Sequence, residues 1–263
     1  ARGAACVGAD DGQPSPRLTM VSLWWPNATS TASQYGRKEC ALWSLAAHRL
    51  LHPYVPTGAS DTFVVRGDDD TYFLLPMLRR FVRQFPPHVP QVWGRVFTPT
   101  DARLAPFVSG GAGAVLSPGV LAALQRSPWG ATAHQLWQAC STRFEAAPTD
   151  VTLANLLAQH DLHPTDSRDT QGRERFHPLD LRDTLRSATS VAWLTSMSTL
   201  PVTLHPSPTF VSTHYMTVES MRCLDDVLLQ PQQAQLDPAC VAVLGLDDPV
   251  VDDFLRSVRL NLP

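Results

Sequence analysis

Apolar residues between positions 18 and 97 follow two different spacings. Runs rich in apolar residues at 18–25, 63–65 and 92–97 are short enough to be buried strands. Segments 34–51 and 74–85 instead place apolar residues three and four positions apart, and a proline lies just beyond each segment. The pattern predicts a strand, a helix, a second strand, a second amphipathic helix and a third strand, in that order.

The same alternation continues in the second half of the chain. Residues 113–116 and 209–215 have strand character, and segments 118–124, 150–159 and 221–228 have helical spacing. Strands that alternate with helices predict an α/β fold with a mostly parallel central sheet flanked by helices. Such sheets bind their ligands at the carboxyl ends of the strands.

We expect one main domain, because 263 residues with 44% apolar content can build a single large core. Residues 1–17 lack periodicity and form a loose lead-in, residues 18–229 form the domain, and residues 230–263 form a C-terminal extension with a short helix. The net charge is −3 and Lys38 is the sole lysine, so we expect no nucleic-acid partner.

Cysteine usage indicates neither a zinc site nor a redox motif, because the five cysteines include no CxxC pair; they are Cys6, Cys40, Cys140, Cys223 and Cys240. Residues 27–29 (Asn-Ala-Thr) form a glycosylation sequon, which fits a secretory compartment with one or two disulfides and one free thiol. No apolar run approaches the roughly 18 residues of a membrane span. The sequence begins at Ala1, which leaves room for an anchor ahead of it.

Three consecutive carboxylates follow the run at 63–65. Asp68, Asp69 and Asp70 repel one another, and capping the next helix needs only one of them, so the cluster favours a bound cation. Oxygen ligands suit Mg²⁺, Mn²⁺ or Ca²⁺. The alternative is a solvated acidic turn. The position between a predicted strand and a predicted helix favours a site.

Two further segments have both a functional and an ordinary interpretation. His214 ends the late strand, where its imidazole can complete the coordination of an ion such as Mn²⁺, although a lone histidine is more often a core or surface residue. The glycine-rich segment 109–113 lets the backbone approach a ligand closely, or is simply a tight loop before a strand.

Asp150 and the loop 166–178 are ambiguous in the same way. Asp150 lies in the first turn of a predicted helix, where a carboxylate also stabilises the helix dipole. The charged loop 166–178 has too few apolar residues to be core, and is either a solvated excursion or part of a binding cleft.

Five motifs together resemble the core 1 β1,3-galactosyltransferase (T-synthase) group, with Fringe as a more distant relative. They are GDDDTYFLLPMLRRF, FVSGGAGAVLSPGVLAAL, TDVTLANLL, DSRDTQGRERFHP and STHY, in the order and spacing of that family. The helical segment YGRKECALWSLAAHRLLH, which contains Trp43, matches as well. The resemblance covers residues 18–229.

The resemblance implies a GT-A glycosyltransferase fold, a UDP-sugar donor, Mn²⁺ or another divalent cation, and inversion that forms a β1,3 linkage. It implies Asp150 as the catalytic base, Trp193 as an acceptor contact, and Asp68, Asp70 and His214 as metal ligands. The resemblance also implies that the UDP-sugar donor is bound by Asp69, Arg37, Arg66, Gly110, Gly111 and Ala112. The expected location is the Golgi or endoplasmic reticulum lumen, as a type II membrane protein whose anchor is not in this sequence.

Several positions depart from the family. Thr149 and Ala154 replace a usual glutamate and glycine, and Leu156 stands where a cysteine is expected, which leaves Cys140 without its usual partner. The segment after Trp193 lacks the aromatic residues of T-synthase, so we expect a different acceptor. UDP-galactose is the first candidate donor. UDP-N-acetylglucosamine, UDP-glucose and a non-catalytic chaperone or glycan-binding role are the alternatives, and a homodimer is left open.

Overall fold

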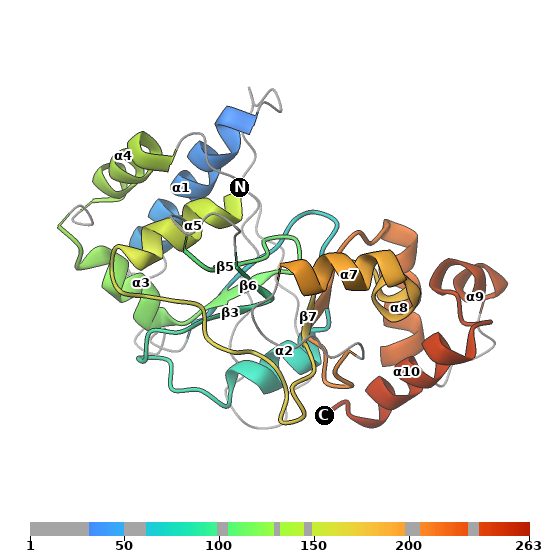
Figure 1. Cartoon of the computed structure of the whole chain (residues 1–263). Helices are drawn as coiled ribbons and strands as arrows, with labels where there is room; N and C mark the ends of the chain where they lie inside the picture. The colour runs from blue at the N-terminus through green and yellow to red at the C-terminus, as the bar shows by residue number, and fades with distance from the viewer. Residues whose placement is uncertain are drawn as a thin grey trace. The chain divides into compact units, whose positions relative to one another are not determined.

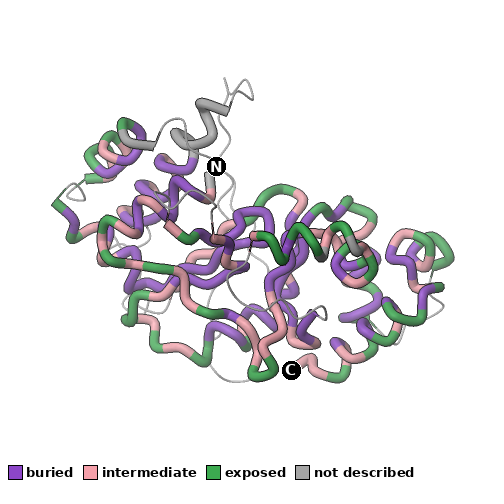
Figure 2. Tube along the Cα trace, viewed as in Figure 1, coloured by how far each residue is buried: buried purple, intermediate pink, exposed green. Residues whose placement is uncertain are grey.

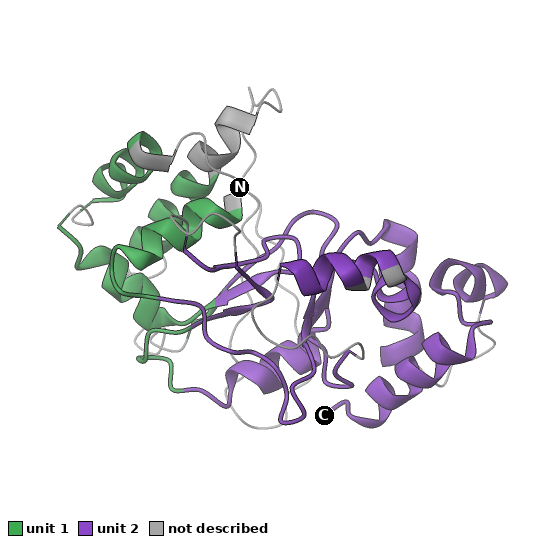
Figure 3. Ribbon diagram, viewed as in Figure 1, with its two compact units in different colours: residues 1–64, 86–91, 116–162 green, residues 65–85, 92–115, 163–263 purple. Residues whose placement is uncertain are grey.

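The chain divides into two compact units, drawn in separate colours in Figure 3. Unit 1 comprises residues 1–64, 86–91 and 116–162, and unit 2 comprises residues 65–85, 92–115 and 163–263. Within these units, the computed structural model describes residues 32–49, 62–98, 105–128, 132–144, 149–197, 206–230 and 237–263. The strand predicted at 18–25 lies outside the described residues.

The described part of unit 1 is helical (Figure 1); its helices are α1 (Ala32–Arg49), α3 (Pro118–Gln125), α4 (Ala133–Phe144) and α5 (Thr149–Ala158). Helix α1 packs against the other three and buries Trp43 completely. Helix α3 begins with Pro118 at its first position, where the missing N–H costs no helical hydrogen bond. The helices predicted at 34–51, 118–124 and 150–159 are confirmed.

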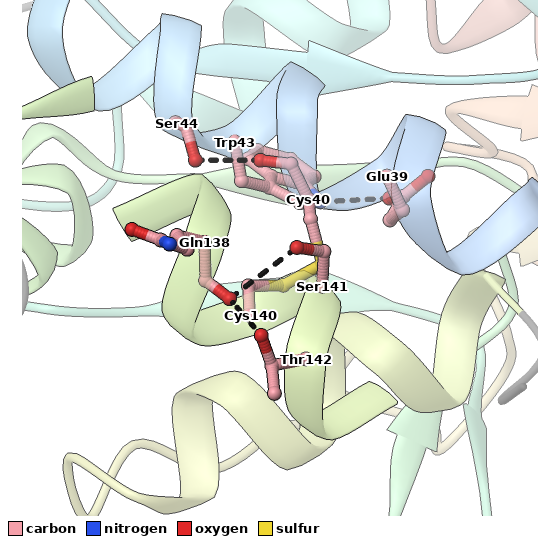
Figure 4. Close-up of a disulfide and its surroundings, with 8 residues drawn as sticks. All are labelled: Glu39, Cys40, Trp43, Ser44, Gln138, Cys140, Ser141 and Thr142. Atoms are coloured by element: carbon pink, nitrogen blue, oxygen red, sulfur yellow. Dashed lines mark hydrogen bonds between the residues drawn. A yellow bond between two sulfur atoms is a disulfide. The ribbon is translucent and has the colours of Figure 1, made fainter. Parts of the chain in front are cut away.

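A disulfide between Cys40 and Cys140 joins α1 to α4 across 100 positions of sequence (Figure 4). Beside it, the indole N–H of Trp43 donates a hydrogen bond to Glu39 Oε1 at 2.7 Å. Cys140 therefore pairs with Cys40, and not with a cysteine at position 156, because the packing of α1 on α4 brings the Cα atoms of Cys40 and Cys140 to 5.6 Å. Leu156 is itself buried, and it fills a core position.

The strands are short and form small sheets. One sheet has the order β1-β6-β3, from Val64–Arg66, Ala114–Leu116 and Val92–Gly94; a second has the order β2-β8-β7, from Tyr72–Phe73, Ser212–Thr213 and Phe176–His177; a third pairs β4 (Val96–Phe97) with β5 (Phe107–Val108). Strand β8 is antiparallel to β2 and parallel to β7, and β4 is antiparallel to β5. The mixed α/β class agrees with the prediction, whereas a mostly parallel sheet stays a prediction.

Two of the predicted strands are shorter than expected. The run at 92–97 is interrupted at Arg95, because β3 pairs in the first sheet and β4 pairs with β5 in the third. The segment 209–215 keeps only the two residues of β8 as strand, because the backbone turns at Tyr215, which has φ 55°.

The helices of unit 2 are α2 (Leu75–Val82), α6 (Leu181–Arg186), α7 (Ala188–Ser196), α8 (Val218–Leu229), α9 (Pro238–Leu244) and α10 (Pro249–Leu260). Helices α2, α6, α8, α9 and α10 contribute buried residues to one hydrophobic core. Met77, Leu224, Leu244 and Leu255 are buried together in this core, and Figure 2 marks the buried stretches of the trace. A second disulfide, Cys223–Cys240, joins α8 to α9.

Residues 237–260 therefore contribute to the same core as α2 and α8, although the sequence analysis places them in an extension. The predicted domain boundaries themselves stay predictions. Among the described helices, none is both long enough and apolar enough to span a membrane.

Candidate functional site

The three consecutive aspartates lie in a tight turn between β1 and β2. Thr71 closes this turn, since its amide donates to the Asp68 carbonyl oxygen at 3.1 Å and its hydroxyl accepts from the Asp68 amide at 2.8 Å. The same hydroxyl donates to the Gly111 carbonyl oxygen at 2.9 Å. The acidic turn is therefore tied to the glycine-rich segment 109–113.

His214 reaches the acidic turn because β8 pairs with β2. Tyr72 lies opposite Thr213 in this antiparallel pair, so the residue after β8 lies beside the residues that precede β2. The Nε2 atom of His214 is 2.9 Å from Asp70 Oδ1 and 3.8 Å from Asp68 Oδ2. One ligand atom from each of these three side chains lies within 4.8 Å of the other two.

The imidazole of His214 is oriented by a backbone carbonyl group. Its Nδ1 atom is 3.2 Å from the Pro178 carbonyl oxygen, which can only accept a hydrogen bond, so Nδ1 carries a proton. In the neutral ring, Nε2 then directs a lone pair at Asp70 Oδ1. That oxygen is buried and accepts no hydrogen bond of good geometry from the described residues. Two facing lone pairs require a cation, which is either a second ring proton or a metal ion.

The donor set suits a divalent cation. Two carboxylates and one imidazole are ligands that Mn²⁺ and similar ions accept. The separations of 2.9 and 3.8 Å match those between neighbouring ligands that each lie about 2.1 Å from one ion. The alternative of a solvated acidic turn does not account for the buried imidazole against it. Asp68, Asp70 and His214 are therefore the candidate metal centre.

Arg66 and two glycines pack tightly around this centre. Arg66 Nη2 lies 3.1 Å from Asp68 Oδ1, and only 10% of the Arg66 side chain is exposed. A Cβ atom on Gly110 would lie 2.1 Å from Arg66 Nη1, and one on Gly111 would lie 2.1 Å from His214 Cε1. The structure thus gives both glycines a packing role. Their predicted contact with the donor stays a prediction.

Some contributors to the site were missed by the sequence analysis. The Ser212 hydroxyl donates to the carbonyl oxygen of Ala112, the third predicted donor residue of this segment. Thr71 stands directly after the acidic triplet, and this position could have indicated that its side chain closes the acidic turn. Pro178 acts only through its backbone carbonyl group, so no side-chain pattern could have identified it.

Two further predicted residues, Arg37 and Asp150, lie in unit 1, and two others, Asp69 and Trp193, lie in unit 2. Asp69 is exposed in the acidic turn, Asp150 lies in the first turn of α5, and Arg37 belongs to α1, where its side chain is outside the described part. Trp193 on α7 is 44% exposed, and its ring lies 5.3 Å from that of Phe97. An exposed, supported aromatic ring suits sugar contact. The roles of all four stay predictions.

The charged loop 166–178 pairs much of its own charge. Asp169 Oδ2 accepts a hydrogen bond from Arg173 Nε at 2.7 Å, and Arg95 Nη1 lies 2.5 Å from Glu174 Oε1. Burial raises the pKa of Glu174 against the opposing effect of Arg95, and burial lowers the pKa of Arg95. Pro178 directly follows β7, and the parallel pairing of β7 with β8 brings its carbonyl group to His214.

The chain is thus a mixed α/β protein with a candidate divalent-cation centre where β1 and β8 end. Residues 39–189 match the Fringe-like family, and since this is more than half of the chain, the chain belongs to that family. The resemblance drawn from the five motifs is confirmed.

The chain is also similar to the glycoprotein-N-acetylgalactosamine 3-beta-galactosyltransferase 1 of Xenopus laevis. The two are 29% identical over 196 residues, which cover 72% of this chain and 51% of the relative. The chain therefore spans about half the length of this curated relative.

Proposed function

We propose that the chain is a metal-dependent, inverting glycosyltransferase. It transfers a hexose, galactose in the first instance, from a UDP-sugar to a hydroxyl group of a glycan or glycoprotein in β1,3 linkage. The substrate class is taken from the Xenopus laevis relative, whose name specifies galactose transfer to N-acetylgalactosamine of a glycoprotein. The GT-A fold, Mn²⁺ and the Golgi or endoplasmic reticulum lumen are taken from the family resemblance.

The proposal rests above all on the contact among Asp68, Asp70 and His214. A divalent ion held there would neutralise the charge that develops on the diphosphate leaving group. The two aspartates supply the negative charge that retains the ion. The Pro178 carbonyl group fixes the ring tautomer in which His214 Nε2 is available as a ligand.

Arg66 and Asp150 take the remaining roles in the proposal. A guanidinium group binds phosphate oxygens well, so Arg66 is assigned to the donor diphosphate, next to Asp69 and the glycines of segment 109–113. Inversion proceeds by a single displacement, and one carboxylate must take the proton of the acceptor hydroxyl. We assign this task to Asp150.

The test is UDP release from UDP-galactose, UDP-N-acetylglucosamine and UDP-glucose, with Mn²⁺ or with chelator. The wild type is compared with Asp70→Ala and with Asp253→Ala, which removes an exposed aspartate of α10. We expect Mn²⁺-dependent release from UDP-galactose that Asp70→Ala abolishes and Asp253→Ala retains.

The other outcomes separate the alternatives. Release from UDP-N-acetylglucosamine or UDP-glucose alone would replace galactose as the donor sugar while leaving the enzyme class intact. No release from any donor, together with no UDP binding, would overturn the proposal in favour of a non-catalytic chaperone or glycan-binding role.

A further inference from the structure

The Thr71 side chain lies at the junction of the acidic turn and the glycine-rich segment 109–113. Only 9% of Thr71 is exposed, and its hydroxyl makes two hydrogen bonds. An amide can only donate and a carbonyl group can only accept, so the hydroxyl accepts from the Asp68 amide and gives its one proton to the Gly111 carbonyl oxygen. A single hydroxyl group therefore connects a predicted metal ligand with the segment predicted to bind the donor.

Asp68 depends on Thr71 for the position of its backbone. The Asp68 side chain is 42% exposed and is paired with Arg66. Thr71 holds the residue at both of its backbone groups, because the Thr71 hydroxyl accepts from the Asp68 amide at 2.8 Å and the Thr71 amide donates to the Asp68 carbonyl oxygen at 3.1 Å. The other end of the triplet is held separately, since the Asp70 carbonyl oxygen accepts from the Met216 amide at 3.0 Å. A change at Thr71 should therefore move Asp68 more than Asp70.

Gly111 connects the same hydroxyl to His214. The imidazole lies so close to Gly111 that an added Cβ would be 2.1 Å from His214 Cε1. The glycine-rich segment holds its own turn, in which the Gly113 amide donates to the Gly110 carbonyl oxygen at 3.0 Å. The hydrogen bond from Thr71 therefore sets where this turn lies against the imidazole.

A second hydroxyl holds the same segment from the other side. Ser212 belongs to β8, two residues before His214, and its hydroxyl donates to the Ala112 carbonyl oxygen. Two consecutive carbonyl groups, those of Gly111 and Ala112, are thus each bound by a hydroxyl from an element that carries a candidate metal ligand. The segment is fixed to the acidic turn through Thr71 and to β8 through Ser212.

We propose that Thr71, with Ser212 in support, is a positioning residue that sets the geometry of the metal ligands and of the glycine-rich segment together. Thr71 is not among the candidate ligands, and it acts through Asp68 and Gly111. Without the hydroxyl, the Asp68 amide and the Gly111 carbonyl group lose this partner and must shift to find another. The effect on the donor rests on the proposed function, whereas the effect on the metal rests only on the candidate metal centre.

The test compares two substitutions at Thr71 with one matched control. Thr71→Val keeps the β-branched shape and removes the hydroxyl, whereas Thr71→Ser keeps the hydroxyl. Ser117→Ala is the control, because the Ser117 hydroxyl also accepts from an amide, that of Gln91 at 2.9 Å, and donates to a carbonyl oxygen, that of Val89 at 2.7 Å. Ser117 is fully buried and belongs to unit 1, whereas the candidate metal centre belongs to unit 2. Urea unfolding of the metal-free proteins checks that each variant is folded.

The first readout is the Kd of Mn²⁺, measured by isothermal titration calorimetry without UDP and with UDP. Changing a group that orients a metal ligand typically lowers metal affinity about 10-fold to 100-fold. Thr71 acts on the backbone of one ligand, so we expect Thr71→Val to raise the Kd about tenfold, at the low end of this range. Thr71→Ser should stay within about threefold of the wild type, because its hydroxyl can make the same two hydrogen bonds. Ser117→Ala should lose stability and leave the Kd unchanged.

The control separates positioning from a general loss of stability. A folded Thr71→Val protein that binds Mn²⁺ as tightly as the wild type would overturn the proposal, and so would an equal loss of affinity in Thr71→Ser or in Ser117→Ala. If Thr71→Val does not fold, Ser212→Ala decides. A Kd raised about threefold or more in that variant supports the positioning of the segment, and an unchanged Kd refutes it.

The second readout separates this proposal from the proposed function. In the transfer assay, we expect Thr71→Val to raise the KM of UDP-galactose more than it lowers kcat, and Ser117→Ala to change neither. A KM of UDP-galactose that stays at the wild-type value would refute the effect on the donor. If the wild type binds Mn²⁺ and transfers no sugar, the proposed function fails and the titration alone decides the role of Thr71. A wild type that binds no Mn²⁺, with or without UDP, refutes the positioning role.

Discussion

Replacing Gly111 with alanine should weaken metal binding without unfolding the protein. The added Cβ would lie 2.1 Å from His214 Cε1, 2.3 Å from Nδ1 and 2.6 Å from Nε2, whereas ordinary contacts begin at 3.4 Å. The ring must therefore retreat by about 1 Å to reach normal van der Waals distance. It cannot do so while keeping both the hydrogen bond to Pro178 and the contact with Asp70.

The size of the effect follows from the role of the ring. Mutating a group that orients a metal ligand typically lowers metal affinity about 10-fold to 100-fold, which is about 1.4 to 2.8 kcal/mol of binding free energy. We expect Gly111→Ala to fall in this range when Mn²⁺ binding is followed by isothermal titration calorimetry. Urea unfolding of the metal-free protein reports separately on overall stability.

Two other glycine variants serve as controls for this measurement. In Gly110→Ala the Cβ meets the Arg66 guanidinium group and leaves the imidazole alone, so a loss of Mn²⁺ affinity in this variant reports on the Arg66–Asp68 pair and not on His214. Gly172→Ala reports on backbone strain alone, since its φ is 75° and nothing lies within 4 Å of the added Cβ. A folded Gly111→Ala protein that binds Mn²⁺ as tightly as the wild type would refute the assignment of His214 as a ligand.

Three further predictions concern stability and catalysis. Replacing Cys40 and Cys140 together by serine should cost about 2–5 kcal/mol in urea unfolding, because the disulfide closes a loop across 100 positions; a loss under about 1 kcal/mol would contradict this. Burial lowers the pKa of His177 from 6.5 to about 3, so the unfolded chain binds the proton more tightly and stability falls as pH drops below about 6.5. As the pH falls from about 7.5 to 5.5, this group should lower the free energy of unfolding by about 1.4 kcal/mol. In His177→Gln, the decrease in the free energy of urea unfolding over this pH range should be smaller by that amount. Equal decreases in the two proteins would disprove the role of His177. Asp150→Asn should lower kcat of transfer about 100-fold or more with little change in the KM of UDP-galactose, and full activity would remove Asp150 from the proposed mechanism.

Much of the helical structure could be predicted from the sequence. Apolar spacing followed by proline located α1 and α2 within a few residues, because such patterns are local. Strands were less predictable, since a two-residue strand such as β8 is defined by its partners and not by its own sequence. The interruption at Arg95 likewise depends on the partners of β3 and β4, which belong to different sheets.

The candidate site shows the same division. The acidic triplet is visible in the sequence, and the end of the late strand offers His214 as a further ligand, but the combined ligand set of Asp68, Asp70 and His214 came from the family resemblance. The structure supplies the physical link, which is the register of Tyr72 opposite Thr213. The Cys40–Cys140 pairing depends on how α1 packs on α4, so no local pattern could have predicted it.

The most direct test of a metal-dependent transferase is product formation itself. A peptide that carries N-acetylgalactosamine is incubated with UDP-galactose and Mn²⁺, and its mass is measured after reaction with the wild type and with His214→Ala. We expect the wild type to add one hexose, chelator to abolish this addition, and His214→Ala to reduce it severely. Hexose addition that neither chelator nor His214→Ala reduces would refute metal-dependent transfer at this centre.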